Sequence, residues 1–249
     1  MLSRYVAHDT WNSYQSMLRI LKNYKMPLRR VPKGSAVPGI EMSFSGYPGV
    51  IYSGDDFTIT SSGLTVLETT IGNNNKALWR HVVPRGSVLE GVRATVANRL
   101  ATDGESWTKV FSRYNSGTYN NQWMVLDNKL FTPHQDQLGD GLLWVLEQIP
   151  GYFRRQDLTE ILQTRTFWPS YNSPFFPGLS LPLLSLYSFH YSEVFNKSGN
   201  SELVKQYGDW FSYDKTPRAL IFARLSLMLD LTQVQLDAIV AETLLRWTT

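Results

Sequence analysis

The sequence predicts one mixed α+β domain, and three observations indicate this fold class. Hydrophobic residues make up 43% of the 249-residue chain, which is enough for a large buried core. Short runs rich in β-branched and aromatic residues, typical of strands, alternate with segments whose apolar residues have helical spacing. Neither an internal repeat nor a linker interrupts this alternation.

The first expected element is an amphipathic helix close to the N-terminus. Its apolar face would consist of residues spaced by three and four positions: Trp11, Tyr14, Leu18 and Leu21. The segment TVLETTI (65–71) follows and predicts a strand, because it is rich in β-branched residues.

A second helix is expected to begin near Val88, because Ser87 and Glu90 have the spacing of a capping box. Its apolar residues are Val92, Val96 and Leu100. The segments QWMVLD (122–127) and GLLWVLEQI (141–149) predict two further strands, the second of them buried.

Asp157 and Glu160 indicate the start of a short helix that ends before Pro169. The last expected element is an amphipathic helix near the C-terminus. Its apolar residues are Leu236, Ile239, Val240, Leu244 and Trp247.

Charge and composition exclude several classes of site. The 24 basic and 21 acidic residues give a net charge of +3, and the only loose basic cluster is Arg29, Arg30 and Lys33, so we expect no nucleic-acid partner. The chain has no cysteine, which excludes a thiolate metal site, a disulfide and a thiol nucleophile within these residues. No general catalytic or phosphate-binding motif is present. The histidines are too dispersed to predict a metal site: His8, His81, His134 and His190.

The stretch between Thr166 and Glu193 carries no charge and is long enough to cross a bilayer. Four prolines and many serines interrupt it, and they would leave backbone groups unpaired in lipid. We therefore expect no transmembrane segment. The N-terminus also lacks the apolar core of a signal peptide.

Several blocks of sequence, in a fixed order, resemble a known family. They include VAHDTWNSYQSMLRILKNY (6–24), NSGTYNNQW (115–123), WPSYNSPFF (168–176) and QYGDWFSYDKTPRA (206–219). Together they resemble the phospholipase B-like proteins over about residues 5–176 and 193–224. The resemblance implies the fold of an N-terminal-nucleophile hydrolase, a four-layer αββα sandwich with two antiparallel sheets, here incomplete at both ends.

The sequence departs from the family pattern in three places. The segment PGLSLPLLSLYSFHYS (177–192) interrupts the pattern, either as a retained intron or as a genuine surface insertion. The tail from about residue 225 diverges. The cysteine nucleophile, expected shortly before Val6, is absent. Residues 1–249 are therefore interpreted as a single, partial catalytic domain.

The resemblance also implies five site residues. His8 and Trp11 match the HxxW pair that flanks the pocket, where a histidine could orient the amine or a substrate carbonyl. Thr70 lies where the family offers a polar group to the oxyanion, and Asn172 matches the pocket asparagine whose amide donates to it. Arg218 matches a pocket arginine suited to holding a carboxylate or phosphate. The alternative for each residue is a structural or solvent-exposed role.

Other conspicuous residues favour structural roles. Asp55 and Asp56 are interpreted as a turn that enters a strand, and Asn120 and Asn121 as turn residues. Asn196 begins a glycosylation sequon, which would suit a lysosomal or secreted parent protein.

The function implied by resemblance is hydrolysis of acyl esters of phospholipids through a cysteine acyl-enzyme, with no metal or cofactor. One alternative is an amidase acting on N-acyl substrates, because the asparagine and arginine also resemble those of penicillin V acylases and bile salt hydrolases. The other is a catalytically inactive fragment that binds lipid or nothing. The partner would be a phospholipid or another acyl substrate, and the sequence does not predict an oligomeric state.

Overall fold

Seven antiparallel strands form the main sheet, and they lie side by side in the order in which they follow one another along the chain. The computed structural model describes residues 2–135, 137–176, 193–230 and 235–241. The strands are β2 (Ile20–Lys25), β3 (Glu41–Gly46), β4 (Phe57–Thr60), β5 (Leu64–Thr69), β6 (Gln122–Asp127), β7 (Leu143–Ile149) and β8 (Tyr152–Asp157).

A second sheet has three strands in the order β1–β10–β9, and all three are parallel. They span Leu2–His8, Gln235–Ala241 and Phe167–Ser170, respectively. The expectation of two antiparallel sheets is therefore wrong for this one. The chain between β9 and β10 includes a long helix, α6, and parallel neighbours require such a crossover.

Six α-helices are found in the described part of the chain. They are α1 (Glu90–Leu100), α2 (Gly104–Phe111), α3 (Thr159–Arg165), α4 (Glu193–Lys197), α5 (Asn200–Tyr207) and α6 (Pro217–Asp230). Short 3₁₀ turns lie at Tyr14–Ser16, Lys76–His81, Asn128–Leu130 and Gly208–Phe211.

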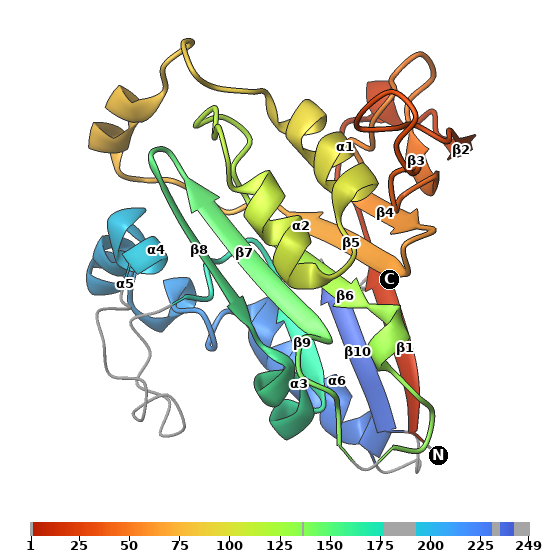
Figure 1. Ribbon diagram of the computed structural model, residues 1–249. Coiled ribbons are helices and arrows are strands. Elements are labelled where there is room, and N and C mark those ends of the chain that lie inside the picture. The colour runs from red at the N-terminus through yellow and green to blue at the C-terminus, as the bar shows by residue number, and fades with distance from the viewer. Residues whose placement is uncertain (1, 136, 177–192, 231–234, 242–249) are drawn as a thin grey trace.

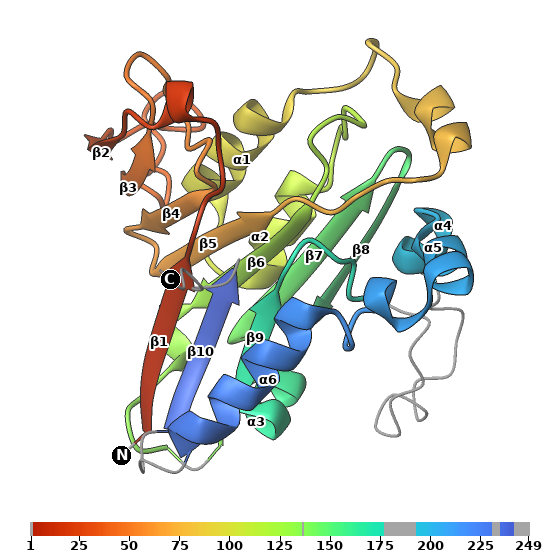
Figure 2. The ribbon, with the colours of Figure 1, turned by 180° about the vertical axis from the view of Figure 1, so that it is seen from behind.

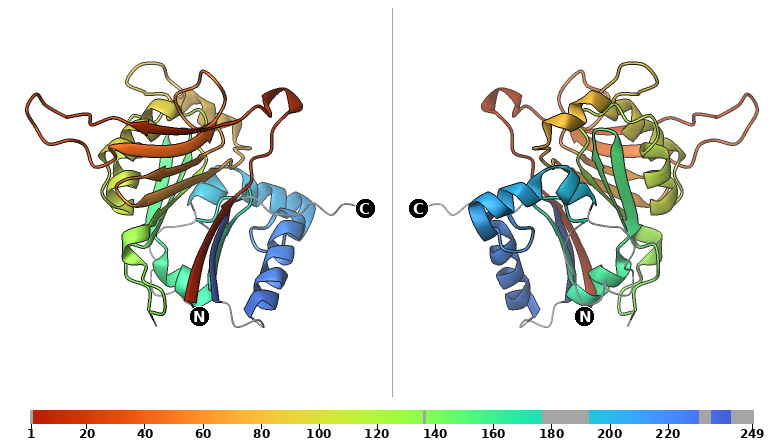
Figure 3. Two further views of the ribbon diagram at one scale, coloured as in Figure 1. Left: turned by 90° about the vertical axis from the view of Figure 1, so that its right-hand side faces the viewer. Right: turned by 90° about the vertical axis from the view of Figure 1, so that its left-hand side faces the viewer.

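The elements are arranged in layers. Helices α1 and α2 cover one face of the seven-stranded sheet (Figure 1), and the three-stranded sheet lies behind the other face. Helix α6 covers the outer side of the small sheet (Figure 2). The side views in Figure 3 show the order helix, sheet, sheet, helix.

Strand alternation divides the core into two halves. Side chains such as Val66 and Val125 point to α1 and α2, where they pack with Trp107 and Phe111. Their neighbours, such as Met124, point to the opposite side. The second half of the core also contains Leu67, Val145, Trp168, Phe175 and Tyr213.

The three predicted strands and two of the predicted helices are confirmed. Strands β5, β6 and β7 lie within one to two residues of the predicted ranges. Helix α3 begins at Thr159, whose N–H donates to Asp157 Oδ1 over 2.9 Å. Helix α1 begins at Glu90, and the predicted capping box is wrong, because the Ser87 hydroxyl donates to Val83 O instead.

The expected N-terminal helix is also wrong. Residues 14–16 form one 3₁₀ turn, and the chain then enters β2, which pairs with β3. The four residues of the supposed apolar face are all exposed: Trp11, Tyr14, Leu18 and Leu21. The apolar residues with helical spacing therefore do not form a buried face in this segment. In addition, the Asn12 side chain accepts a hydrogen bond from Ser13 N, and local bonds of this kind compete with helix formation.

The expected C-terminal helix is wrong over residues 235–241, which form strand β10, and Leu244 and Trp247 lie outside the described residues. This strand lies between β1 and β9, and a central strand of a parallel sheet reads as a nearly continuous apolar run. Short apolar runs of this kind do not distinguish strand from helix by spacing alone.

Candidate active site

Four of the predicted site residues lie at or beside the ends of secondary-structure elements. His8 is the last residue of β1, and Thr70 directly follows β5. Asn172 lies two residues beyond the end of β9, and Arg218 lies in the first turn of α6. Strands β1 and β9 are both parallel to β10, so their carboxyl ends point to the same edge of the small sheet.

Asn172 joins two of these residues through hydrogen bonds. Its amide Nδ2 donates to Thr70 O over 2.8 Å, and its Oδ1 accepts from Arg218 Nη1 over 2.8 Å. The residue has φ of 65°, a left-handed conformation that asparagine adopts more readily than most residues. Both ends of the amide are thus fixed, and one of its two N–H groups points to the Thr70 carbonyl.

Trp11 extends this series to a fourth residue. The Arg218 guanidinium lies over the Trp11 ring, 5.5 Å from its centroid, a cation–π contact. Trp11 is 64% exposed, and its ring Nε1 donates to Asp9 Oδ2 over 3.1 Å. The role of Trp11 in the pocket stays a prediction.

His8 is held beside the same region. Its Nε2 lies 2.8 Å from Glu68 O, two residues before Thr70, and this contact assigns the proton to Nε2. Its Nδ1 lies 3.3 Å from Thr10 Oγ1, and Thr10 donates to Asp55 O over 2.9 Å.

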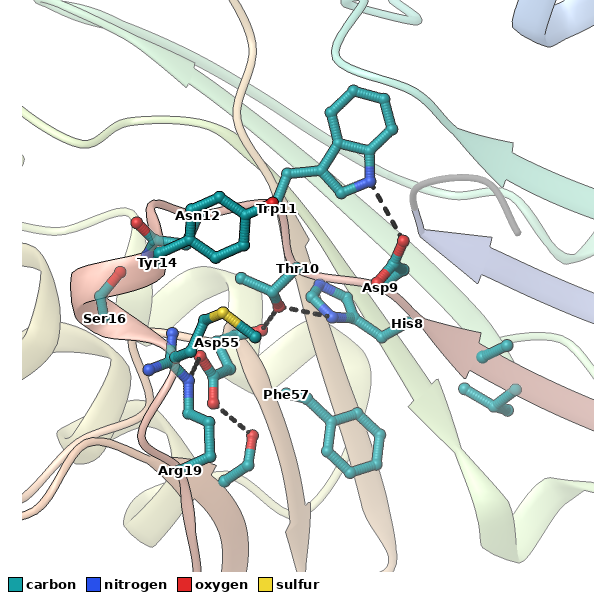
Figure 4. Close-up of a pocket in the computed structure, with 14 residues that line it drawn as sticks. His8, Asp9, Thr10, Trp11, Asn12, Tyr14, Ser16, Arg19, Asp55 and Phe57 are labelled. Carbon is teal, nitrogen blue, oxygen red and sulfur yellow. Dashed lines mark hydrogen bonds and ion pairs between the residues drawn. The ribbon is translucent and has the colours of Figure 1, made fainter. Parts of the chain in front are cut away.

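A pocket of about 850 Å³ opens next to the end of β1 (Figure 4). His8 and Trp11 are among its lining residues, whereas the other three predicted site residues are not. Apolar and polar side chains share the wall, including Val6, Met17, Phe57, Arg19 and Asp55.

Asp55 and Arg19 form an ion pair in the pocket wall. Arg19 Nε donates to Asp55 Oδ1, and the Ser45 hydroxyl donates to Asp55 Oδ2 over 2.6 Å. The predicted turn is confirmed, because Asp56 has φ of 60° and β4 begins at Phe57. The sequence did not predict that Asp55 would also be buried and paired.

Asp56 lies in a second buried polar group. Burial raises its pKa, and hydrogen bonds with the Glu68 and Tyr119 side chains oppose this shift. Tyr119 donates to Asp56 Oδ2 over 2.6 Å, and Tyr119 and Asn121 both have positive φ, as expected for turn residues. A hydrogen bond between two carboxyl groups requires that one of them carries a proton.

Glu90 belongs to the helix side of the main sheet. Burial raises its pKa to about 8, with a further contribution from the charge of Asp56, and Arg93 opposes the shift.

Across the described ranges, His, Asp and Glu side chains form no group of three suited to a metal ion. Within those same ranges, no helix is both long and apolar enough to cross a membrane.

Asn196, the predicted glycosylation site, is exposed near the end of α4. Its modification stays a prediction. The segment 177–192 lies outside the described residues, so the structure does not test its origin.

Comparison with known proteins agrees with the resemblance that the sequence blocks indicated. The profile of the Phospholipase B family matches residues 3–236. The chain belongs to this phospholipase B family. Its relatives include "Putative phospholipase B-like 2" of Mus musculus and of Homo sapiens, each 53% identical over 221 residues. "Phospholipase B-like protein A" of Dictyostelium discoideum is 42% identical over 218 residues.

These phospholipase B-like relatives are longer proteins. Each match covers 88% of this chain but only 34–35% of the relative. The chain therefore spans about a third of their length.

Proposed function

We propose that this chain is part of a hydrolase of the N-terminal-nucleophile type that cleaves acyl esters of phospholipids. The nucleophile would be a cysteine outside residues 1–249, and the expected fold is the αββα sandwich. The order of layers and the family membership support this proposal. The small sheet departs from the expected pattern because its strands are parallel.

The orientation of the Asn172 amide is the observation that carries the proposal. Arg218 holds Oδ1 and Thr70 O holds one N–H, so the second N–H of Nδ2 is directed to a position set by the protein. A pre-oriented donor of this kind stabilises the oxyanion of an acyl-transfer intermediate, and one such donor contributes about 3–4 kcal/mol.

The proposed reaction has two steps. The cysteine sulfur attacks the ester carbonyl, the lysophospholipid alcohol leaves with a proton, and a thioester to the fatty acid forms. Water then attacks the thioester and releases the free fatty acid and the thiol. His8 would orient the amine of the nucleophile or the substrate carbonyl, and Arg218 would hold both Asn172 and the acidic part of the substrate.

The full-length, processed parent protein is the right sample for the test. It would be incubated with phospholipids and, separately, with N-acyl amino acids, and released fatty acid would be measured. We expect release from phospholipids. Release from the amides alone would remove the phospholipase hypothesis and favour the amidase.

Residues 1–249 alone are proposed to be inactive, because they contain no cysteine. Turnover by this chain above a blank would show that the nucleophile has been assigned incorrectly. By resemblance, the parent protein is proposed to be lysosomal or secreted, and imaging of the tagged parent in cells tests this.

A further inference from the structure

Three buried polar residues form a row across β5, β6 and β7, near one end of these strands. Thr69 of β5 is the direct cross-strand partner of Gln122 of β6, and Gln122 is the partner of Glu147 of β7. All three are at most 3% exposed, and their alternation places them on the face toward the small sheet. Their neighbours on that face are apolar, among them Met124, Val145 and Ile149.

A continuous series of hydrogen bonds links this row to the small sheet. The Ser170 hydroxyl of β9 donates to Gln122 Oε1, and Thr69 and Ser170 share a further bond between their hydroxyls. Gln122 Nε2 donates to Glu147 Oε1 over 2.6 Å. Ser170 uses its one proton on Gln122, so Thr69 is the donor to Ser170.

Glu147 is the last side chain of this series, and it binds the backbone of the segment that follows β9. Its Oε1 accepts from Phe175 N, and its Oε2 accepts from Phe176 N over 3.2 Å. Burial raises the pKa of Glu147 to about 7, and the bonds from Phe175, Gln122 and Phe176 oppose the shift. A fully buried carboxyl group is costly, and the three hydrogen bonds that Glu147 accepts offset part of this cost.

The anchored segment contains Asn172. Ser170 lies two residues before it, and Phe175 lies three residues after it, and both are bound to one connected set of side chains. Thr69 adjoins Thr70, whose carbonyl accepts from Asn172. The same set thus holds the backbone on both sides of the Asn172 amide and the strand end that receives its hydrogen bond.

We infer that Glu147 is a positioning residue, which fixes the Asn172 amide by holding the backbone of residues 170–176. The inference rests on the proposed function, because a positioned amide matters only if Asn172 acts on a substrate. It assigns Glu147 no contact with the substrate. Its effect on catalysis passes entirely through Asn172.

Glu147→Gln is the first test, made in the full-length parent protein. A glutamine has one acceptor oxygen where the carboxylate has two, so its NH₂ group would face a backbone N–H and break one of the bonds to 175–176. Hydrogen exchange should then become at least tenfold faster for the backbone N–H groups of residues 171–176, apart from Pro174, which has none. The matched control is Glu90→Gln, which replaces another buried carboxyl group on the helix side of the main sheet. This control should leave the exchange of 171–176 unchanged.

A double-mutant cycle with Asn172→Asp supplies the catalytic test. Glu147→Gln should lower kcat about tenfold or more and leave KM nearly unchanged, and it should have no further effect in the Asn172→Asp background. Additive losses would overturn the inference, as would unchanged exchange of residues 171–176. Ser170→Ala breaks the same series with a smaller change and replaces Glu147→Gln if that variant does not fold.

The two proposals fail in different ways. If the parent protein releases no fatty acid from any substrate, the proposed function fails, and faster exchange at 171–176 still shows that Glu147 holds this segment. If activity is found but neither variant alters exchange or kcat, the positioning role fails and the function stands.

Discussion

Arg218 Nη1 donates to Asn172 Oδ1 over 2.8 Å. The two residues are distant in sequence, and the chain between them includes α4 and α5. The bond fixes which end of the Asn172 amide is the acceptor, so it also fixes where the donor end points. The orientation of the candidate oxyanion donor therefore depends on the placement of α6.

Arg218→Met in the parent protein should lower kcat/KM on the order of a hundredfold, because it frees the Asn172 amide and removes a charge from the site. Steady-state kinetics measure this effect. Arg224→Met is the matched control, since Arg224 is exposed on the same helix. An equal loss in both variants would show that general destabilisation of α6 is the cause.

Asn172→Asp should lower kcat by about 10²–10³ with little change in KM, because it replaces an oxyanion donor by an acceptor of the same shape. Aspartate tolerates the left-handed conformation and keeps the contact with Arg218, but it loses the hydrogen bond to Thr70 O, so the melting temperature should fall modestly. Kinetics and thermal unfolding on the same sample test both parts. Unchanged kcat would exclude Asn172 from the oxyanion site.

The protein should be more stable near pH 5 than near pH 8. Folding raises the pKa of Glu90 from 4.5 to about 8 and that of Glu147 from 4.5 to about 7, so the folded state binds more protons than the unfolded state in this range. Their contribution is complete below pH 4.5 and is lost as pH rises through the folded values. Each group contributes a slope of at most about 1.4 kcal/mol per pH unit.

Urea unfolding at several pH values measures this slope. Glu90→Gln should make the fall in unfolding free energy between pH 5 and pH 8 shallower, because glutamine does not titrate. Glu202→Gln is the control, since Glu202 is exposed and lies on α5. A slope unaffected by Glu90→Gln would contradict the assignment.

Asp55→Asn should reduce the free energy of unfolding by about 1–3 kcal/mol, because it leaves the Arg19 charge without its partner in the pocket wall. The value lies below that of a fully buried pair, since the Arg19 side chain is 27% exposed. Asp209→Asn breaks the exposed pair with Lys215 and should cost clearly less than Asp55→Asn, because solvent screens this pair. Denaturant titrations of the unmodified protein and the two variants measure the free energies of unfolding. Equal losses in the two variants would show that the pocket pair stabilises the fold no more than the exposed pair.

Sequence patterns predicted the middle of the main sheet well and the edges poorly. QWMVLD matches β6 residue for residue, because a strand buried on both faces is a dense apolar run. The segment around Leu18 and Leu21 was predicted as a helix because the spacing argument assumes that apolar residues are buried, and here they are exposed. Strand β10 was predicted as a helix because its spacing allowed both structures. Its place between β1 and β9 is set by residues distant in sequence, which a local pattern does not contain.

The site residues came from resemblance, and no spacing rule would have grouped them. Thr70, Asn172 and Arg218 meet only because β5, β9 and α6 end or begin near one another. Glu147 was visible as a carboxylate inside the apolar run GLLWVLEQI, and a charge in a buried strand is a signal in itself. Its partners at Phe175 and Phe176 were not predictable, because they are backbone groups of a loop.

The pairing of β1 with β10 has a consequence for biosynthesis. Leu2 is the register partner of Gln235, so β1 lacks this neighbour until the ribosome has also translated β10. At ordinary elongation rates the interval between the two strands lasts on the order of tens of seconds. Nascent chains that stall between β1 and β10 should therefore expose β1 to chaperones or to mispairing.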